Sequence, residues 1–147
     1  MRLVSTSEHK NAEQILCDLR KERNEKANFS DRSTPTLEEH CAFVESGPYM
    51  ACYLIDIDFL SAKWPMRGIV GAIHLTKQRE IGIVILKQYR RRGMAQLAIK
   101  LLMHRHPGNF LANVSPNNYP SIKFFEKLGF KLIQNTFALD SNNGRLI

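Results

Sequence analysis

Apolar residues recur at helical spacing in the N-terminal third of the chain. Within residues 8–24 one face is apolar and the rest is charged or polar, which predicts an amphipathic helix. The apolar face is made of Ala12, Ile15, Leu16 and Leu19. A second helix is predicted over residues 37–45, because Thr36 and Glu39 have the spacing of a capping box.

Shorter runs rich in apolar, β-branched and aromatic residues predict strands. They cover residues 2–5, 49–57, 69–75 and 80–86. Residues 76–79 are expected to form the hairpin turn between the last two strands. Residues 59–66, which include Trp64 and Pro65, are predicted to be a loop or turn, and residues 28–33 have a loop-like composition.

Helices and strands alternate in the C-terminal half. A helix is predicted after Gly93, and it should end before Pro107 and Gly108. Further elements are a strand over 110–114, a helix over 118–128 that Gly129 ends, a strand over 130–139 and a frayed tail over 141–145. Antiparallel strands followed by a β-α-β-α-β order are typical of the α+β class.

Composition indicates an ordinary globular protein. A chain of 147 residues, 44% hydrophobic and 24% charged, is expected to form one domain with a real core. No apolar run approaches the roughly 20 residues that span a bilayer, and polar residues follow the first four positions where a signal peptide would be apolar. We therefore expect a cytoplasmic protein without a membrane partner.

The cysteine spacing and the net charge indicate which bonds and which ligands to expect. Cys17, Cys41 and Cys52 have neither close pairing nor metal-ligand spacing, so we expect free buried thiols, with no disulfide framework and no metal. The net charge of +7 favours an anionic partner. Because the only dense basic run is at residues 90–92, an anionic cofactor accounts for it without nucleic acid.

The junction at residues 81–97 has the most specific pattern. An apolar strand pattern ends in a basic turn with Gly93, and the turn opens into a helix. The start of a helix offers free N–H groups and a positive dipole end, so this turn can hold a phosphate or pyrophosphate. Gly93 would let the backbone approach the ligand. The alternative is an ordinary strand-to-helix loop with solvated arginines.

Two sequence blocks resemble one family. Arg90-x-x-Gly93-x-Ala95 is similar to the Q/R-x-x-G-x-G/A pyrophosphate loop of the GNAT superfamily of acyl-CoA N-acyltransferases, and it is neither a P-loop nor a Rossmann fingerprint. Residues 118–130 resemble the later N-x-x-A-x-x-F-Y-E-K-L-G-F segment of that family. The resemblance implies a GNAT fold with a mixed, mostly antiparallel sheet. Helices would flank the sheet, and two central parallel strands, 80–86 and 110–114, would splay apart to admit acetyl-CoA.

The resemblance also implies a cofactor site. Backbone groups of Ile83 and Ile85 would pair with the pantetheine arm, and the turn that begins at Arg91 would hold the pyrophosphate. The full expected set is Ile83, Val84, Ile85, Arg90, Arg91, Arg92, Gly93, Met94, Ala95, Gln96, Asn118 and Phe125. Core packing is the alternative for Ile83 and Ile85, and a helix N-cap is the alternative for Asn118.

The implied chemistry is direct transfer of an acetyl group to an amine, which needs a base and an oxyanion donor. Glu80 is the candidate base, with His74 and His40 as other candidates and a solvated surface role as the alternative for Glu80. The family usually offers a tyrosine as general acid where this chain has Phe125. The thiolate of coenzyme A would then leave unprotonated, or it would take a proton from water or from Ser115.

We therefore expect a single GNAT domain over residues 1–147 that acetylates a primary amine of a small molecule. Arg23 and Asn24, with residues 36–40, loosely resemble family members that acetylate nucleotide-linked amino sugars. The alternatives are an enzyme acting on a protein lysine or nucleic-acid amine, and a non-catalytic acyl-CoA-binding protein. The oligomeric state stays open, with a homodimer as one possibility.

Overall fold

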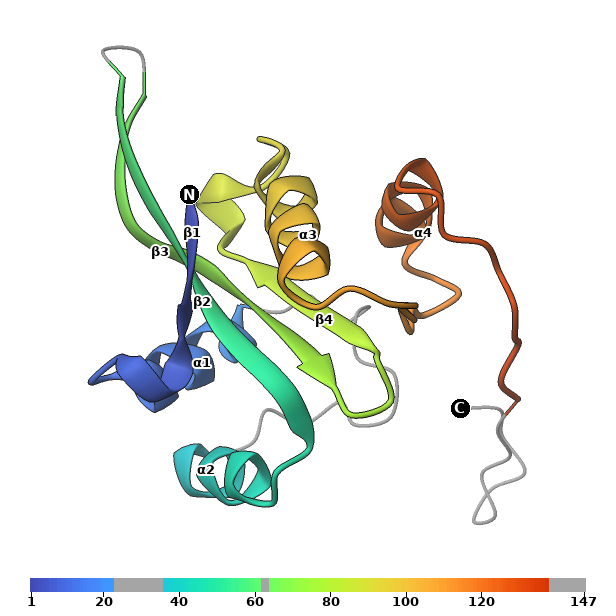
Figure 1. The fold of residues 1–147 in the computed structure, drawn as a ribbon, viewed down its shortest axis with the longest axis horizontal. Coiled ribbons are helices and arrows are strands. Elements are labelled where there is room, and N and C mark those ends of the chain that lie inside the picture. Colours follow the sequence, from blue (N-terminus) through green and yellow to red (C-terminus); the bar gives the residue numbers. More distant parts are fainter. Residues whose placement is uncertain (23–35, 62–63, 138–147) are drawn as a thin grey trace.

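A four-stranded antiparallel sheet in the order β1-β2-β3-β4 forms the centre of the computed structural model (Figure 1), which describes residues 1–22, 36–61 and 64–137. The strands are β1 (Arg2–Ser5), β2 (Tyr49–Ser61), β3 (Trp64–Thr76) and β4 (Ile81–Ile85). The helices are η1 (Thr6–Glu8), α1 (Ala12–Lys21), α2 (Leu37–Glu45), η3 (Lys87–Tyr89), α3 (Met94–Arg105) and α4 (Tyr119–Lys127).

Each face of the sheet carries its own hydrophobic cluster, because successive side chains of a strand point to opposite faces. On one face Ile55, Ile57 and Ile73 pack with Ile99 and Leu102 of α3. Aromatic and aliphatic residues of α4 and the segment after it pack against the same cluster: Phe124, Phe125, Leu128 and Phe130. On the other face the cluster consists of Ala12 and Leu19 of α1 with Leu54 and Ala72. In Figure 1 α3 crosses the sheet and α4 lies past β4.

The structure confirms the α+β class and most elements of the N-terminal half. Helix α2 has the predicted bounds, and its capping box is formed. Thr36 N–H donates to Glu39 Oε2 at 2.8 Å, and Glu39 N–H donates to Thr36 Oγ1 at 3.2 Å. Helix α1 covers Ala12–Lys21, so it begins later than predicted, after the 3-10 turn over residues 6–8 and three further non-helical residues. The predicted loop over 28–33 and the tail over 141–145 lie outside the described residues.

The predicted loop or turn over residues 59–66 is wrong at its described residues, 59–61 and 64–66. Strand β2 continues to Ser61 and β3 already begins at Trp64, with Leu60 opposite Pro65 in the register. A proline costs one ladder hydrogen bond, and this is tolerated in a two-stranded ribbon beyond the rest of the sheet. An ion pair between Arg67 and Asp58, at 3.2 Å, supports the pairing of the two strands.

The two C-terminal strand predictions are also wrong in extent. In place of a strand over 110–114 there is one parallel bridge, between Leu111 and Glu80. Residues 131–137 form no strand, and residues 138 and 139 lie outside the described part of the chain. Leu132, Ile133 and Phe137 are 83%, 76% and 89% exposed. An apolar pattern alone does not make a strand, because a strand needs a neighbour to pair with.

Candidate active site

The outer edge of β4 presents unpaired backbone groups. In an antiparallel ladder, hydrogen-bonded pairs alternate with pairs whose backbone groups point away from the partner. Leu86 N–H donates to the Val70 carbonyl at 2.9 Å. The register therefore makes Ala72–Val84 and His74–Gly82 the hydrogen-bonded pairs of this ladder. The backbone groups of Ile81, Ile83 and Ile85 consequently point to the other side, along the edge next to residue 111.

Two of these outward groups already have partners. Ile81 N–H donates to the Leu111 carbonyl at 2.8 Å, and the Ile85 carbonyl accepts from Arg90 Nε at 2.8 Å. Among the described residues no strand pairs with this edge beyond the single bridge at Glu80. The Ile83 N–H and C=O and the Ile85 N–H are thus placed to pair with an extended ligand.

The side chains of this strand are structural. Those of Ile83 and Ile85 belong to the cluster under α3, and that of Val84 packs against the cluster of α1. Core packing of Ile83 and Ile85 is therefore confirmed, and pairing of their backbone with the pantetheine arm remains a prediction. Their side chains form the core, while their backbone groups face the open edge.

The turn after β4 brings a helix N-terminus to the end of that edge. Arg91 and Gly93 have positive φ, 61° and 75°, and α3 begins directly afterwards at Met94. The N-cap residue of α3 is Gly93, which has no side chain to cap the helix. A Cβ built on Gly93 meets nothing within 4 Å, so the backbone before the helix faces open space. This is the arrangement in which a helix start binds a phosphate.

Arg90 is held away from that open space by protein carbonyls. Besides its bond to Ile85, its Nη2 donates to the Glu22 carbonyl at the end of α1, at 3.0 Å. The Glu22 carboxylate in turn accepts from the Lys87 N–H at 3.1 Å. Sequence reasoning missed Glu22, which is 65 residues from Lys87 in the chain. Arg91 and Arg92 are exposed beside the helix start.

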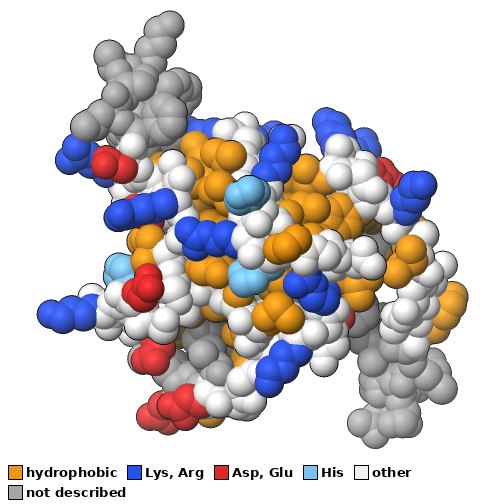
Figure 2. Space-filling view, in the orientation of Figure 1, with side chains coloured by type: hydrophobic (Ala, Val, Ile, Leu, Met, Phe, Trp, Pro, Cys, Tyr) orange, Lys and Arg blue, Asp and Glu red, His pale blue; other side chains and the backbone are white. Residues whose placement is uncertain are grey.

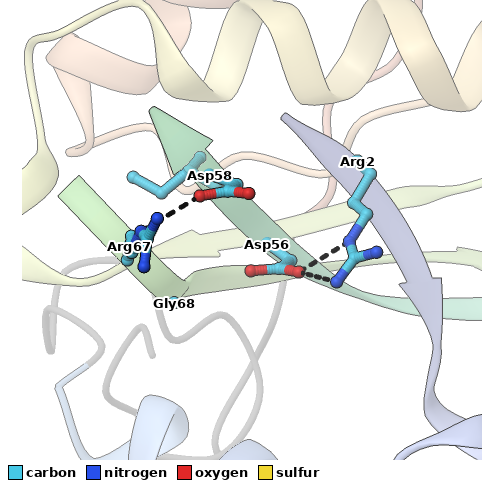
Figure 3. Close-up of a pocket in the computed structure, with 6 residues that line it drawn as sticks. Arg2, Asp56, Asp58, Arg67 and Gly68 are labelled. Carbon is cyan, nitrogen blue, oxygen red and sulfur yellow. Dashed lines mark hydrogen bonds and ion pairs between the residues drawn. The ribbon is translucent and has the colours of Figure 1, made fainter. Parts of the chain in front are cut away.

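A cavity of about 230 Å³ adjoins the same helix start, and it is lined by Met1, Ile57, Arg92, Gly93, Met94 and Leu97. A second hollow, of about 240 Å³, lies on β2 and β3 (Figure 3). Its two acids are neutralised, since Asp56 pairs with Arg2 at 2.7 Å and Asp58 with Arg67 at 3.2 Å. The second hollow therefore offers no free charge to a ligand.

The start of α4 carries the next predicted residues. The side chain of Asn118 accepts from Ser121 N–H at 3.4 Å, which makes it the N-cap of α4. The Asn118 N–H donates to the Ser115 carbonyl at 2.9 Å, so these two predicted residues lie together. Phe125 is half-buried, with ring centroids 5.3 Å from Phe124 and 5.2 Å from Phe130. A cofactor contact by Asn118, Ser115 or Phe125 remains a prediction.

Two of the candidate bases lie at the other end of β4. Glu80 N–H donates to Thr76 Oγ1 at 3.0 Å, and Glu80 forms the bridge with Leu111. The imidazole of His74 rests on the backbone of β4, since a Cβ on Gly82 would collide with it. Its ring centroid is 4.4 Å from that of Tyr49, a neighbour that sequence reasoning did not identify. The third candidate, His40, lies in α2, and its side chain is outside what the structure describes.

Three further features of the described residues are the charge on one face, the grouping of metal-ligating side chains and the character of the helices. On the face shown in Figure 2, Lys and Arg side chains are spread out with hydrophobic side chains between them. Within residues 1–22, 36–61 and 64–137, no three His, Cys, Asp or Glu side chains gather as a metal ion would require. None of the helices in these ranges combines the length and apolar character needed to cross a membrane.

Solved structures share the fold at low identity. A Streptococcus mutans protein, smu.2055, has a TM-score of 0.68 at 16% identity, with 99% of this chain and 93% of that chain covered. An aminoglycoside antibiotic 6′-N-acetyltransferase from Acinetobacter haemolyticus has a TM-score of 0.64 at 15% identity, covering 96% and 98%. A chimera of the Vibrio cholerae spermidine N-acetyltransferase has a TM-score of 0.62 at 14% identity, covering 99% and 92%.

A sequence profile of the Acetyltransferase (GNAT) family matches residues 14–130, which include both sequence blocks, the open edge of β4 and the start of α3. The match covers most of the chain, and the family uses acetyl-CoA as co-substrate. The chain therefore belongs to the acetyltransferase (GNAT) family and has the GNAT fold.

Proposed function

We propose that this protein transfers the acetyl group of acetyl-CoA to a primary amine of a small polar molecule, within one GNAT domain over residues 1–147. One observation carries the proposal. The open backbone edge of β4 is followed, after the turn over residues 86–93, by the start of α3, where Gly93 has no side chain to cap the helix. An extended arm that ends in a pyrophosphate fits this edge and helix start in that order.

The cofactor would lie along β4 with its phosphates at α3. The N–H groups of Met94, Ala95 and Gln96, with Arg91 and Arg92, would hold the pyrophosphate. The arm would pair with the backbone of Ile83 and Ile85, and the thioester would lie toward the other end of the strand. Asn118, Ser115 and Phe125 would line the far side of the cleft.

The reaction forms one bond and breaks one. The amine nitrogen attacks the thioester carbonyl carbon, a C–N bond forms, and the C–S bond then breaks to release the thiolate of coenzyme A. The amine proton goes to a base, for which Glu80 and His74 are the candidates at that end of β4. Phe125 cannot protonate the thiolate, so the thiolate would take its proton from water or from Ser115.

Small amines are the favoured acceptors. Two structural relatives are named for spermidine and for an aminoglycoside, and both of these compounds carry primary amines. Within this class of small amines we propose a nucleotide-linked amino sugar as the acceptor, because Arg23, Asn24 and residues 36–40 resemble family members that acetylate such sugars. The scattered basic residues of Figure 2 give no specific support to a protein or nucleic-acid acceptor.

Turnover on a panel of amines tests the proposal. The full-length protein is incubated with acetyl-CoA and a polyamine, an aminoglycoside, a nucleotide-linked amino sugar, a lysine-rich peptide or an oligonucleotide. Released thiol and the acetylated product are measured, with a reaction lacking amine as control. Acetylation of a small amine supports the proposal. Binding of acetyl-CoA without turnover would favour the non-catalytic alternative, and absence of binding would refute both.

A further inference from the structure

The side chain of Arg79, in the turn between β3 and β4, binds the loop after α3. Its Nε donates to the Asn109 carbonyl at 3.1 Å, and its Nη2 donates to the carbonyls of His106 at 2.8 Å and Pro107 at 3.1 Å. The guanidinium carbon also lies 4.6 Å from the centroid of the Phe110 ring. One side chain thus contacts four of the five positions 106–110, all except Gly108.

The backbone of Arg79 binds the next residue of the same loop. Leu111 N–H donates to the Arg79 carbonyl at 2.9 Å, and the Leu111 carbonyl accepts from Ile81 N–H at 2.8 Å. These two bonds make the bridge at Glu80, which is the one place in the described chain where the segment after α3 pairs with β4. Beyond Leu111 no further described residue of this segment pairs with β4, and we call the space beside this unpaired edge the proposed cofactor cleft.

The position of this bridge limits the cleft at one end. At the other end β4 finishes at Ile85, and the turn over residues 86–93 leads to the start of α3 at Met94. Ile81 and Ile85 are separated by four residues of strand, or about 14 Å at the usual rise. An arm anchored by its phosphates at α3 and running back along β4 therefore meets the Leu111 bridge at its reactive end.

We propose that Arg79 is a positioning residue that sets the closed end of this cleft, and with it the place where the thioester stops. This inference rests on the proposed function, because it assumes that acetyl-CoA lies along β4. Arg79 itself does not touch the reacting atoms. Its Nε and Nη2 donate to carbonyls of the loop and its Nη1 lies 3.7 Å from Met50 Sδ, so it acts through the position of Leu111.

The geometry requires arginine in particular. Its planar fork reaches several carbonyls at once, whereas a lysine ammonium is a single point charge. The positive φ of Arg79, 69°, belongs to the tight hairpin turn between β3 and β4, in which Arg79 N–H donates to the Thr76 carbonyl at 2.9 Å. At Gly108 a Cβ would lie 2.7 Å from Arg79 Nη2, so the loop leaves room for the guanidinium.

The test compares Arg79→Lys and Arg79→Gln with Lys77→Gln. The control removes a charge from the same turn, and Lys77 is exposed. The variants are expected to fold, because the end of α3 is also held by Arg105 Nη1 on the Leu3 carbonyl at 2.9 Å and by the Tyr53–His106 hydrogen bond at 2.8 Å. Turnover, the acetyl-CoA dissociation constant and hydrogen exchange of the Ile81 and Leu111 amides are measured for each.

In Arg79→Gln we expect kcat to fall on the order of tenfold to a hundredfold, as for a displaced reacting group. Acetyl-CoA affinity should change far less, since the phosphate end is intact. Exchange at Ile81 and Leu111 should accelerate in both Arg79 variants and stay unchanged in Lys77→Gln. Unchanged exchange and kcat in the Arg79 variants, or equal changes in the control, would overturn the inference.

The two proposals fail in different ways. If the wild-type protein shows no turnover with any amine, the proposed function fails, and the exchange of the Ile81 and Leu111 amides alone decides whether Arg79 holds the bridge. If the wild type turns over and Arg79→Lys matches it in kcat and exchange, only the inference about Arg79 fails. A variant with a lowered melting temperature but unchanged kcat would show a purely structural role and would also overturn it.

Discussion

Replacing Gly93 by alanine should separate the cofactor role of this residue from its backbone role. Gly93 has φ of 75°, and its added Cβ would meet nothing within 4 Å. The stability cost therefore comes from the left-handed backbone alone and should be about 1 kcal/mol. For a chain of this length that corresponds to a fall in melting temperature of about 2–4 °C.

The same methyl group should weaken acetyl-CoA binding much more. It projects into the open space before α3, where the pyrophosphate is proposed to lie. Displacing the phosphate from one backbone N–H loses a hydrogen bond to a charged group, worth about 1.5–3 kcal/mol. The dissociation constant for acetyl-CoA should rise by about tenfold to a hundredfold. Calorimetry at fixed salt measures it.

Gly129 provides the matched control. It has φ of 91°, and a Cβ there also meets nothing within 4 Å, but it follows the end of α4. Gly129→Ala should lose similar stability and keep its affinity for acetyl-CoA. Equal affinities for Gly93→Ala, Gly129→Ala and the wild type would refute the placement of the pyrophosphate at α3, whatever the melting temperatures.

Three further predictions concern single side chains. Glu80→Gln should lower kcat at neutral pH and leave acetyl-CoA affinity unchanged, and kinetics with no loss of rate would exclude Glu80 as the base. Phe125→Tyr should fold with a change in unfolding free energy below about 1 kcal/mol, because the ring is only half-buried, and its kcat should equal or exceed the wild-type value. Burial raises the pKa of the Cys52 thiol from 9.0 to about 11, although its hydrogen bond with Thr6 opposes this. Iodoacetamide at pH 8 should therefore alkylate Cys52 about a hundredfold more slowly in the folded than in the unfolded protein, as read by peptide mass spectrometry.

The elements that could be predicted from sequence are those specified by neighbouring residues. The capping box at Thr36 and Glu39 needs only four consecutive positions, and it is formed as predicted. The strand, turn and helix at β4 and α3 were also marked locally, by an apolar run and by Gly93. Local hydrogen bonding and backbone preference determine such features, so a short window of sequence contains the information.

The errors occurred where pairing with a distant segment decides the structure. Pro65 looked like the centre of a loop, yet the register of β2 and β3 continues through it. Residues 110–114 and 130–139 had the pattern of strands, but only Leu111 bonds to a neighbouring strand among the described residues. An alternating apolar pattern shows that a segment is able to form a strand. Whether a neighbouring strand is available to pair with it depends on the whole fold.

In the candidate site, too, features set by neighbouring residues could be predicted and contacts between distant segments could not. The turn before α3 could be predicted because its residues are contiguous, and Asn118 could be identified as a helix cap by its place before α4. The bonds of Arg79 to the loop after α3 span 27 to 30 residues, and Glu22 contacts the β4–α3 turn across 65 residues or more. No motif marks such contacts, since they arise when separate elements pack together.

Two arginines hold the two ends of the open edge of β4, and both do so through backbone carbonyls. At the helix end Arg90 binds the carbonyls of Ile85 and Glu22. At the closed end Arg79 binds the loop that carries Leu111. In both arginines Nε and Nη2 are the atoms that bind protein carbonyls. Ligand binding along this edge should therefore depend mainly on backbone N–H groups, whose positions these arginines fix, so loss of either arginine should disturb the geometry of the cleft more than its charge.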